Sequence, residues 1–284
     1  MVIETKAYAK INLSLDIVGK RADGYHLLRT VMQSVSLYDT VSAEKSGEIF
    51  LSCETPGLPL DEKNTAVKAA RVFFSETGLS GGVRLRMEKR IPMQAGLGGG
   101  SADAAAVLHL LNRLYETGFS VKELCRMGEK VGADVPFCVF GGTALAEGIG
   151  ETLRRLEPMP PCEIVIVRPE TGVSTAEAYA EIDRRERSEL VPETTEAMLR
   201  ALAGGSVREI GHTLFNAFDF VSASDDRDAI KAKMCRMGAL GVCMSGSGSA
   251  VFGLFGAGDP QAEECRRVLA RQYGTAFLCR PVFE

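Results

Sequence analysis

A run of glycines is the part of the sequence that points most directly to chemistry. The run comprises four glycines, Gly96, Gly98, Gly99 and Gly100, interrupted by Leu97, and Ser101 follows it. Glycine has no Cβ atom, so successive backbone N–H groups in the run can converge on an anion. The alanine- and leucine-rich segment 104–114 predicts a helix just after it, whose N-terminal N–H groups and dipole would face the same anion. The run predicts a phosphate cradle, in which the Ser101 hydroxyl caps the helix or meets a phosphate or magnesium ion; a tight turn before a helix is the alternative.

The run does not match the two commonest phosphate-binding motifs. Ser101 and Ala102 stand where the G-x-x-x-x-G-K-[ST] loop has its lysine. The G-x-G-x-x-G fingerprint fits poorly too, because no acidic residue follows a strand at the required distance. The sequence therefore predicts a different kind of phosphate cradle.

Length and charge narrow the class of protein. Single hydrophobic cores stop growing at roughly 250–300 residues, so a chain of 284 residues favours two domains. A net charge of -4 gives no basic field for nucleic acid or an anionic membrane, although a few local cations can still hold an anionic substrate. No apolar run reaches the roughly 18 residues of a membrane span. We expect neither a nucleic-acid nor a membrane partner.

The cysteines indicate the compartment. There are eight, widely spread and never in a C-x-x-C pattern, which argues against a zinc site. The chain shows no basic-then-apolar leader. We therefore expect reduced, mostly buried thiols and a cytoplasmic location.

Strands and helices must position the glycine run. Residues 11–17 alternate apolar and polar side chains, which is typical of a strand, and Asp23-Gly24 predicts the turn after it. Ser120 and Glu123 form a capping box that opens a helix ending near Gly132, and a second box is predicted at Ser174. The other predicted strands are 31–37, 40–45 and 48–53, expected to be antiparallel and joined by short turns, and 83–87, 163–167, 242–244, 251–255 and an edge strand, 275–279; the other predicted helices are 64–76, 196–202, 230–237 and 261–272.

This order of elements favours the α+β class. Strands and helices mix without regular β-α-β alternation, which argues against a doubly wound sheet. Three prolines between residues 158 and 161 break the pattern. We place the domain boundary there, with domains at 1–158 and 159–284.

The segment 92–105 (PMQAGLGGGSADAA) resembles the middle motif of the GHMP small-molecule kinases. Three further segments carry the same resemblance, in the order and at the spacing of that family. They are 7–13 with 21–26 (AYAKINL and RADGYH), 132–137 (GADVPF) and 244–250 (MSGSGSA). Ala102 departs from the many members that have a second serine there. The segment DGYH points to a member of the family whose substrate carries cytidine diphosphate.

The resemblance implies a fold and a reaction. The fold would have two α+β domains, the first with a ribosomal-protein-like left-handed β-α-β unit, and the active site in the cleft between them. The reaction would transfer the γ-phosphate of ATP, with Mg²⁺, to the tertiary 2-hydroxyl of a cytidine-diphosphate-linked methylerythritol, in the non-mevalonate route to isoprenoid precursors. We expect a monomer or a weak homodimer.

Two residues would carry the catalysis that the resemblance implies. Asp134 would be the general base, and its alternative role is to cap a helix whose first turn contains Pro136. Lys10 would keep Asp134 ionised and lower the pKa of the substrate hydroxyl; its alternative role is that of a solvated surface charge.

The resemblance also assigns the binding residues. Tyr25 and Tyr179 would stack on cytosine, His26 would hydrogen-bond its polar edge, and Asn12 would contact the substrate; singly, these residues could be ordinary surface or core positions. The residues expected around ATP are Asn64, which could be only an N-cap, Lys89, Pro92, Gly96, Leu97, Gly98, Gly99, Gly100, Ser101 and Ala102. Ser101 is also the candidate ligand for Mg²⁺. The histidines at 109 and 212 would be structural.

Two other functions stay open at this point. One is a different GHMP kinase, acting on a sugar, homoserine or mevalonate, against which the Tyr25-His26 pair argues. The other is a nucleotide-binding regulator without catalysis, against which the presence of both Lys10 and Asp134 argues.

Overall fold

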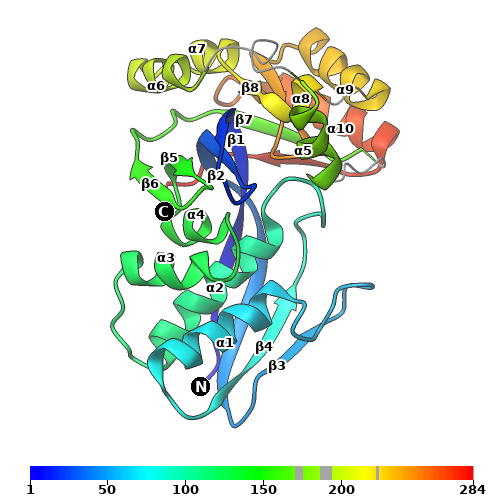
Figure 1. Cartoon of the computed structure of the whole chain (residues 1–284). Helices are drawn as coiled ribbons and strands as arrows, with labels where there is room; N and C mark the ends of the chain where they lie inside the picture. Colours follow the sequence, from blue (N-terminus) through cyan, green and yellow to red (C-terminus); the bar gives the residue numbers. More distant parts are fainter. Residues whose placement is uncertain (170–174, 186–193, 222–223, 284) are drawn as a thin grey trace. The chain divides into compact units, whose positions relative to one another are not determined.

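The computed structural model of the chain describes residues 1–169, 175–185, 194–221 and 224–283 (Figure 1). These residues form two compact units that interleave along the chain. The first comprises Met1–Lys10, Leu37–Met93 and Gly98–Gly141, and the second comprises Ile11–Ser36, Gln94–Leu97 and Gly142–Glu284. The interleaving arises because the long strands β1 (Ile3–Lys20) and β2 (His26–Ser46) contribute residues to both units. The predicted division at 158/159 stays a proposal about folding domains.

The first unit holds the helices that follow the glycine run. Besides parts of β1 and β2, its elements are β3 (Phe50–Cys53), α1 (Thr65–Thr77), β4 (Gly82–Glu88), α2 (Gly99–Leu114), α3 (Val121–Glu129) and α4 (Val135–Phe140). Helix α2 buries alanine and leucine side chains along most of its length and packs against α1 and α4 (Figure 1). The N-terminus of α2 is thereby fixed on a rigid element, which a phosphate site requires.

The second unit contains a separate sheet covered by helices. Its remaining elements are β5 (Thr143–Gly148), β6 (Thr152–Arg155), β7 (Glu163–Val167), α5 (Thr175–Asp183), α6 (Thr195–Gly204), α7 (Val207–His212), β8 (Phe215–Asn216), α8 (Ala217–Val221), α9 (Asp225–Arg236), β9 (Gly241–Met244), β10 (Val251–Phe255), α10 (Pro260–Tyr273) and β11 (Ala276–Cys279). The sheet has the order β11-β7-β10-β9, and α9 and α10 pack on it through Ile230, Met234 and Leu269 (Figure 1).

The mixture of sheets and helices confirms the α+β class. The edge position of β11 and the capping box at Ser120 are also confirmed. The second predicted box, at Ser174, lies outside the described residues. The separate strands predicted at 31–37 and 40–45 are one continuous strand, β2, because pairing with β5 and then with β4 carries it through the break in alternation.

Strand β3 corrects a second expectation. The order β3-β4-β2 places β4 between β3 and β2, and β3 runs parallel to β4 with Leu51 opposite Leu85. Segments 40–45 and 48–53 are therefore not paired neighbours, because α1 carries the chain from β3 to its parallel partner, as parallel pairing requires. The eight cysteines are all free thiols; Cys235 is exposed, and Cys162, Cys243, Cys265 and Cys279 are buried.

Candidate active site

The glycine run ends in a helix N-terminus whose first backbone N–H groups make no hydrogen bond within the helix. Gly98 is the N-cap of α2 in the left-handed conformation, with φ of 69°, and no side chain caps the helix. The first helical hydrogen bond runs from Ala102 N to Gly98 O at 2.8 Å. The N–H groups of Gly99, Gly100 and Ser101 therefore have no acceptor within the helix. Three such donors on one turn are suited to bind a phosphate.

Close packing explains why these positions are glycine. A Cβ atom on Gly98 would lie 2.9 Å from Lys10 Cγ, and one on Gly99 would lie 3.0 Å from Ile91 Cγ2. A Cβ on Gly100 would lie 3.1 Å from the Thr65 hydroxyl, which donates to Gly100 O at 2.6 Å. The amide-lined turn thus lies directly against the stem of Lys10, which places a candidate catalytic cation next to the predicted phosphate site.

Lys10 and Asp134 form an ion pair beside this turn. Lys10 Nζ lies 3.4 Å from Asp134 Oδ2; the lysine side chain is 4% exposed and the aspartate 39%. Asp134 occupies the N-cap position of α4, but its carboxylate makes no capping hydrogen bond, and Pro136 lies in the first turn as predicted. The carboxylate is therefore not used to cap the helix, and its role as general base stays a prediction. Lys10 is buried, so its alternative as a solvated surface charge is wrong.

A buried charge cluster lies beneath the same turn. Lys89 Nζ donates to Asp103 at 2.5 Å and to Asp39, while Asp39 also accepts from the backbone N–H of Ile91 at 2.8 Å. Burial acts to lower the pKa of Lys89, but the two carboxylates outweigh it and raise the pKa. Burial raises the pKa of Asp103 to about 7, and its Oδ1 has no hydrogen-bond partner. Because the ammonium of Lys89 is buried and held by two carboxylates, its predicted contact with ATP stays a prediction.

The positions of four other predicted ATP-binding residues do not by themselves support a contact with ATP. The Asn64 side chain caps α1 by accepting from Ala66 N at 2.9 Å and donates to Pro59 O at 2.8 Å, so the capping role is confirmed. The side chains of Leu97 and Ala102 are buried, and the amide of Ala102 is used in the helix. Pro92 is half-buried ahead of the run. These four contacts stay predictions.

The start of the glycine run is held by the loop 245–249, within the second unit. Ser245 Oγ donates to Gly96 O at 2.9 Å, and Ala250 N donates to Ala95 O at 3.0 Å. A Cβ atom on Gly96 would lie 2.0 Å from Ser245 O, and Gly96 has φ of +75°. Position 96 is therefore glycine because the backbone of residue 245 approaches it closely within this unit.

We expect Gly96→Ala to destabilise the protein by about 2–4 kcal/mol, combining left-handed strain with an overpacked contact. Gly118→Ala is the matched control, since Gly118 has φ of +69° and nothing within 4 Å of its built Cβ. Urea unfolding of both variants measures the difference. Equal losses of stability would show that the approach to Ser245 contributes nothing.

Asn12 is buried, and its side chain hydrogen-bonds a backbone N–H group and a side-chain hydroxyl within its own unit. Its Oδ1 accepts from Gly246 N at 3.0 Å, and its Nδ2 donates to Thr30 Oγ1 at 2.9 Å. Asn216, which the sequence analysis missed, donates to Met244 O and Gly246 O at 2.8 Å each. The two asparagines fix the loop 245–249, and the predicted substrate contact of Asn12 stays a prediction.

The predicted base-binding residues lie together in the second unit. Tyr25 is 62% exposed on the turn between β1 and β2. His26 stacks on Tyr179 with ring centroids 4.6 Å apart and 20° between the planes, and Tyr179 meets Phe218 edge to face at 4.8 Å. One face of Tyr179 is thus covered by His26, and its stacking on a base stays a prediction. His26 Nε2 also lies 2.8 Å from Asp183 Oδ1, a partner that sequence reasoning missed.

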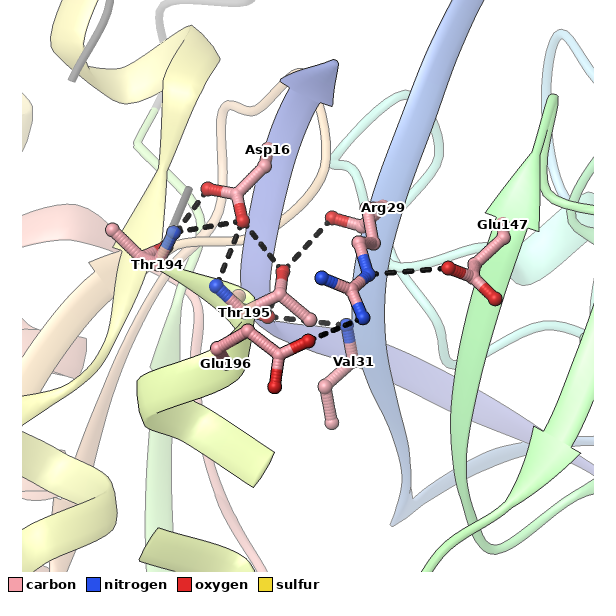
Figure 2. Close-up of polar contacts among 8 residues, drawn as sticks. Asp16, Arg29, Val31, Glu147, Thr194, Thr195 and Glu196 are labelled. Carbon is pink, nitrogen blue, oxygen red and sulfur yellow. Dashed lines mark hydrogen bonds and ion pairs between the residues drawn. The ribbon is translucent and has the colours of Figure 1, made fainter. Parts of the chain in front are cut away.

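Polar contacts in the same unit fix the start of α6 (Figure 2). Asp16 accepts hydrogen bonds from the backbone N–H and the hydroxyl of both Thr194 and Thr195, at 2.6–2.9 Å. Arg29 lies between Glu147 and Glu196, at 3.1 and 2.6 Å (Figure 2). The carboxylate of Asp16 on β1 therefore caps the N-terminus of α6, which is distant in sequence. No local sequence pattern indicates this contact.

His109 makes its contact with the backbone of the described part of the chain. His109 is largely buried and pairs with Val139 O at 3.1 Å; burial lowers its pKa. Among the described residues, no three His, Cys, Asp or Glu side chains gather closely enough to hold a metal ion. None of the described helices is long and apolar enough to cross a membrane.

Comparisons with known proteins identify the family of the chain. Two family models match, GHMP kinases N terminal domain over residues 64–142 and GHMP kinases C terminal over residues 198–275. The 4-diphosphocytidyl-2-C-methyl-D-erythritol kinase of Clostridium botulinum (strain Alaska E43 / Type E3) is 41% identical, over 99% of this chain and 100% of that protein. A crystal structure of 4-(cytidine 5'-diphospho)-2C-methyl-D-erythritol kinase has a TM-score of 0.83 at 35% identity, over 99% of this chain and 100% of that one. Homoserine kinase from Cytophaga hutchinsonii ATCC 33406, at 20% identity, 99% and 95% coverage and a TM-score of 0.80, is similar in fold alone.

The chain belongs to the GHMP kinase family, since both family models match in order and a relative is 41% identical along nearly the whole chain. It is a kinase that uses ATP as phosphate donor and acts on a small molecule. Within the family, its full-length similarity is to the 4-diphosphocytidyl-2-C-methyl-D-erythritol kinases.

Proposed function

We propose that this chain transfers the γ-phosphate of ATP to the 2-hydroxyl of 4-diphosphocytidyl-2-C-methyl-D-erythritol, in non-mevalonate isoprenoid precursor biosynthesis. The observation that carries the proposal is the Lys10–Asp134 pair at 3.4 Å, packed against the amide-lined N-terminus of α2. A relative 41% identical over nearly the whole chain carries that activity in its name, which favours this acceptor over homoserine or mevalonate. A regulator without catalysis would have no need of the ion pair.

Asp134 and Lys10 supply the proton chemistry. Asp134 takes the proton of the 2-hydroxyl as its oxygen attacks the γ-phosphorus, and the bond to the bridging oxygen breaks to release ADP. Lys10 favours the developing alkoxide electrostatically. Lys10 is almost fully buried, whereas Asp134 is partly exposed, so solvent screens the pair on the side of the carboxylate.

The glycine run supplies the phosphate cradle. The N–H groups of Gly99, Gly100 and Ser101 donate to phosphate oxygens, with the helix dipole behind them. A cavity of about 430 Å³ lies in the same unit, lined by Cys53, Thr55, Pro56, Arg86 and Lys89 among others, and we assign it to the nucleoside of ATP. The remaining contacts with ATP are assigned to Asn64, Pro92, Gly96, Leu97, Gly98 and Ala102.

Magnesium fits the donor set beside the run. Mg²⁺ binds few protein ligands and takes most of its oxygens from nucleotide phosphates and water, so the single hydroxyl of Ser101 next to a phosphate cradle is consistent with it. When bound, the ion would neutralise charge on the phosphates.

The cytosine end of the acceptor is assigned mainly to aromatic side chains. The exposed ring of Tyr25 stacks on cytosine, Tyr179 completes the stack, His26 binds the polar edge of the base, and Asn12 contacts the alcohol. Stacking of this kind contributes roughly 1–3 kcal/mol per base. A cytoplasmic location, a monomer or weak homodimer, and the lack of a nucleic-acid partner belong to the same proposal.

A substrate panel tests the proposed acceptor. ADP release is measured with ATP and, in turn, 4-diphosphocytidyl-2-C-methyl-D-erythritol, homoserine, mevalonate or no alcohol. We expect release to depend on the cytidine-linked alcohol, with kcat/KM at least about a hundredfold above the other two, since both base stacking and hydrogen bonding are lost with them. Equal or greater release with homoserine or mevalonate would replace the acceptor, and ATP binding without any release would support the regulator.

A further inference from the structure

One carboxylate holds the two strand ends that flank the turn carrying Tyr25. Asp183 Oδ2 accepts from Lys20 Nζ at 2.7 Å, and Asp183 Oδ1 lies 2.8 Å from His26 Nε2. Lys20 is the last residue of β1 and His26 is the first residue of β2. Asp183 therefore closes the base of the turn between them.

The helix that carries Asp183 is itself fixed against the same strands. Ala178 and Ile182 of α5 are buried in a cluster with Leu15, against which Leu28 also packs. Tyr179 and Asp183 are one helical turn apart, so they share a face of α5. His26 stacks on the first and bonds the second, and its side chain is only 9% exposed. The plane and the rotation of the imidazole are therefore both set by α5.

The contact with Asp183 also selects which nitrogen of His26 carries the proton. Hydrogen bonds from Lys20 and then from His26 hold the pKa of Asp183 below its ordinary value, so the carboxylate is ionised and only accepts. His26 Nε2 must then be the donor. In the neutral ring this leaves Nδ1 as an acceptor, and no described residue donates to it.

We propose that Asp183 is a positioning residue that holds His26 as the Nε2–H tautomer and so presents Nδ1 as an acceptor for an exocyclic amino group of the bound base. The inference rests on the proposed function, in which His26 faces the polar edge of cytosine. Cytosine carries an amino group at position 4, where uracil carries a carbonyl oxygen. A uracil there would set one acceptor against another, so the same contact would favour cytidine over uridine.

The tautomer is measured directly by ¹⁵N NMR on histidine-labelled protein without substrate, which is practical because the chain has 3 histidines. The signal of His26 is assigned by its loss in His26→Gln. We expect the Nε2–H tautomer in the wild type. In Asp183→Asn, the new amide can donate to Nε2, so we expect the Nδ1–H form to become populated. An imidazolium or Nδ1–H form in the wild type, or an unchanged spectrum in the variant, would overturn the inference.

Kinetics then test what the tautomer does for binding. We expect Asp183→Asn to raise KM for 4-diphosphocytidyl-2-C-methyl-D-erythritol about tenfold, the effect of one lost hydrogen bond, with kcat and KM for ATP within about twofold. Preference over the uridine analogue should fall by a similar factor, and Asp183→Glu should restore part of it. Glu181→Gln, on the same helix with Arg184 and Arg185 as partners, should match the wild type.

Lys20→Met separates the two contacts of Asp183. It removes the ion pair at Oδ2 but leaves the one at Oδ1, so the His26 tautomer should persist and KM should rise less than about threefold, as expected of an exposed ion pair. A rise as large as that of Asp183→Asn would assign the effect to the turn and overturn the role of the tautomer. A wild type that phosphorylates neither nucleotide-linked alcohol would refute the proposed function, whereas an active wild type with an unchanged KM in Asp183→Asn would refute this inference alone.

Discussion

Asp134→Asn should lower kcat by about a hundredfold or more while leaving the fold intact, because a general base contributes roughly 10²–10⁴-fold to such a reaction. The carboxylate makes no capping hydrogen bond and is partly exposed, so an asparagine amide of the same size can take its place without disturbing the start of α4. KM for both substrates should change only a few-fold. Steady-state kinetics with thermal unfolding of the same sample measure both quantities.

Asp259→Asn is a suitable control for this variant. Asp259 is the N-cap of α10 and its side chain does accept from Gln261 N, at 2.9 Å, but it belongs to no proposed site. Asparagine is as good an N-cap as aspartate, so both activity and stability should be kept. A kcat for Asp134→Asn within a few-fold of the wild type would remove Asp134 from the mechanism.

Lys10→Met should lower kcat by about a hundredfold, the usual effect of losing one preorganised electrostatic contact in a catalytic site. Methionine keeps an apolar stem of similar length against Gly98, so packing there is preserved. Asp134 is partly exposed, so its charge stays hydrated when its partner is gone. Kinetics and a cooperative thermal transition are measured together.

Lys6→Met serves as the control on the same strand, since Lys6 lies over the Tyr38 ring at 4.5 Å and contacts no predicted site residue. In the double variant of Lys10 and Asp134, the losses should be far from additive if the two act as one unit. A folded Lys10→Met enzyme with normal turnover would refute its role. If that variant loses cooperativity, Lys10→Gln with the same readouts decides the question.

Local patterns predicted the elements that depend on local physics. The alternation at 11–17, the N-cap at Asn64 and the capping box at Ser120 each have their cause within a few residues, and the structure contains all three. The helix after the glycine run was predicted from its alanines, although it begins at Gly99, inside the run, because Gly98 supplies the left-handed N-cap.

Contacts between distant segments could not be predicted in the same way. Asp16 caps α6, Asp39 and Asp103 hold Lys89, and Asp183 holds His26, and each pairing joins residues far apart in the chain. The reason for Gly96 is likewise a backbone at residue 245, which no spacing within the run reveals. Strands β5 and β6 were missed because they are short and lack clear alternation.

The central claim is that this kinase phosphorylates the 2-hydroxyl of a cytidine-diphosphate-linked methylerythritol. The most direct measurement is ³¹P NMR of the product formed from ATP and 4-diphosphocytidyl-2-C-methyl-D-erythritol. The account predicts ADP together with one new phosphomonoester signal per molecule, placed on the 2-carbon by its coupling, beside an intact diphosphate. A new phosphate on another oxygen, or a full ATP signal after prolonged incubation with folded enzyme, would contradict it.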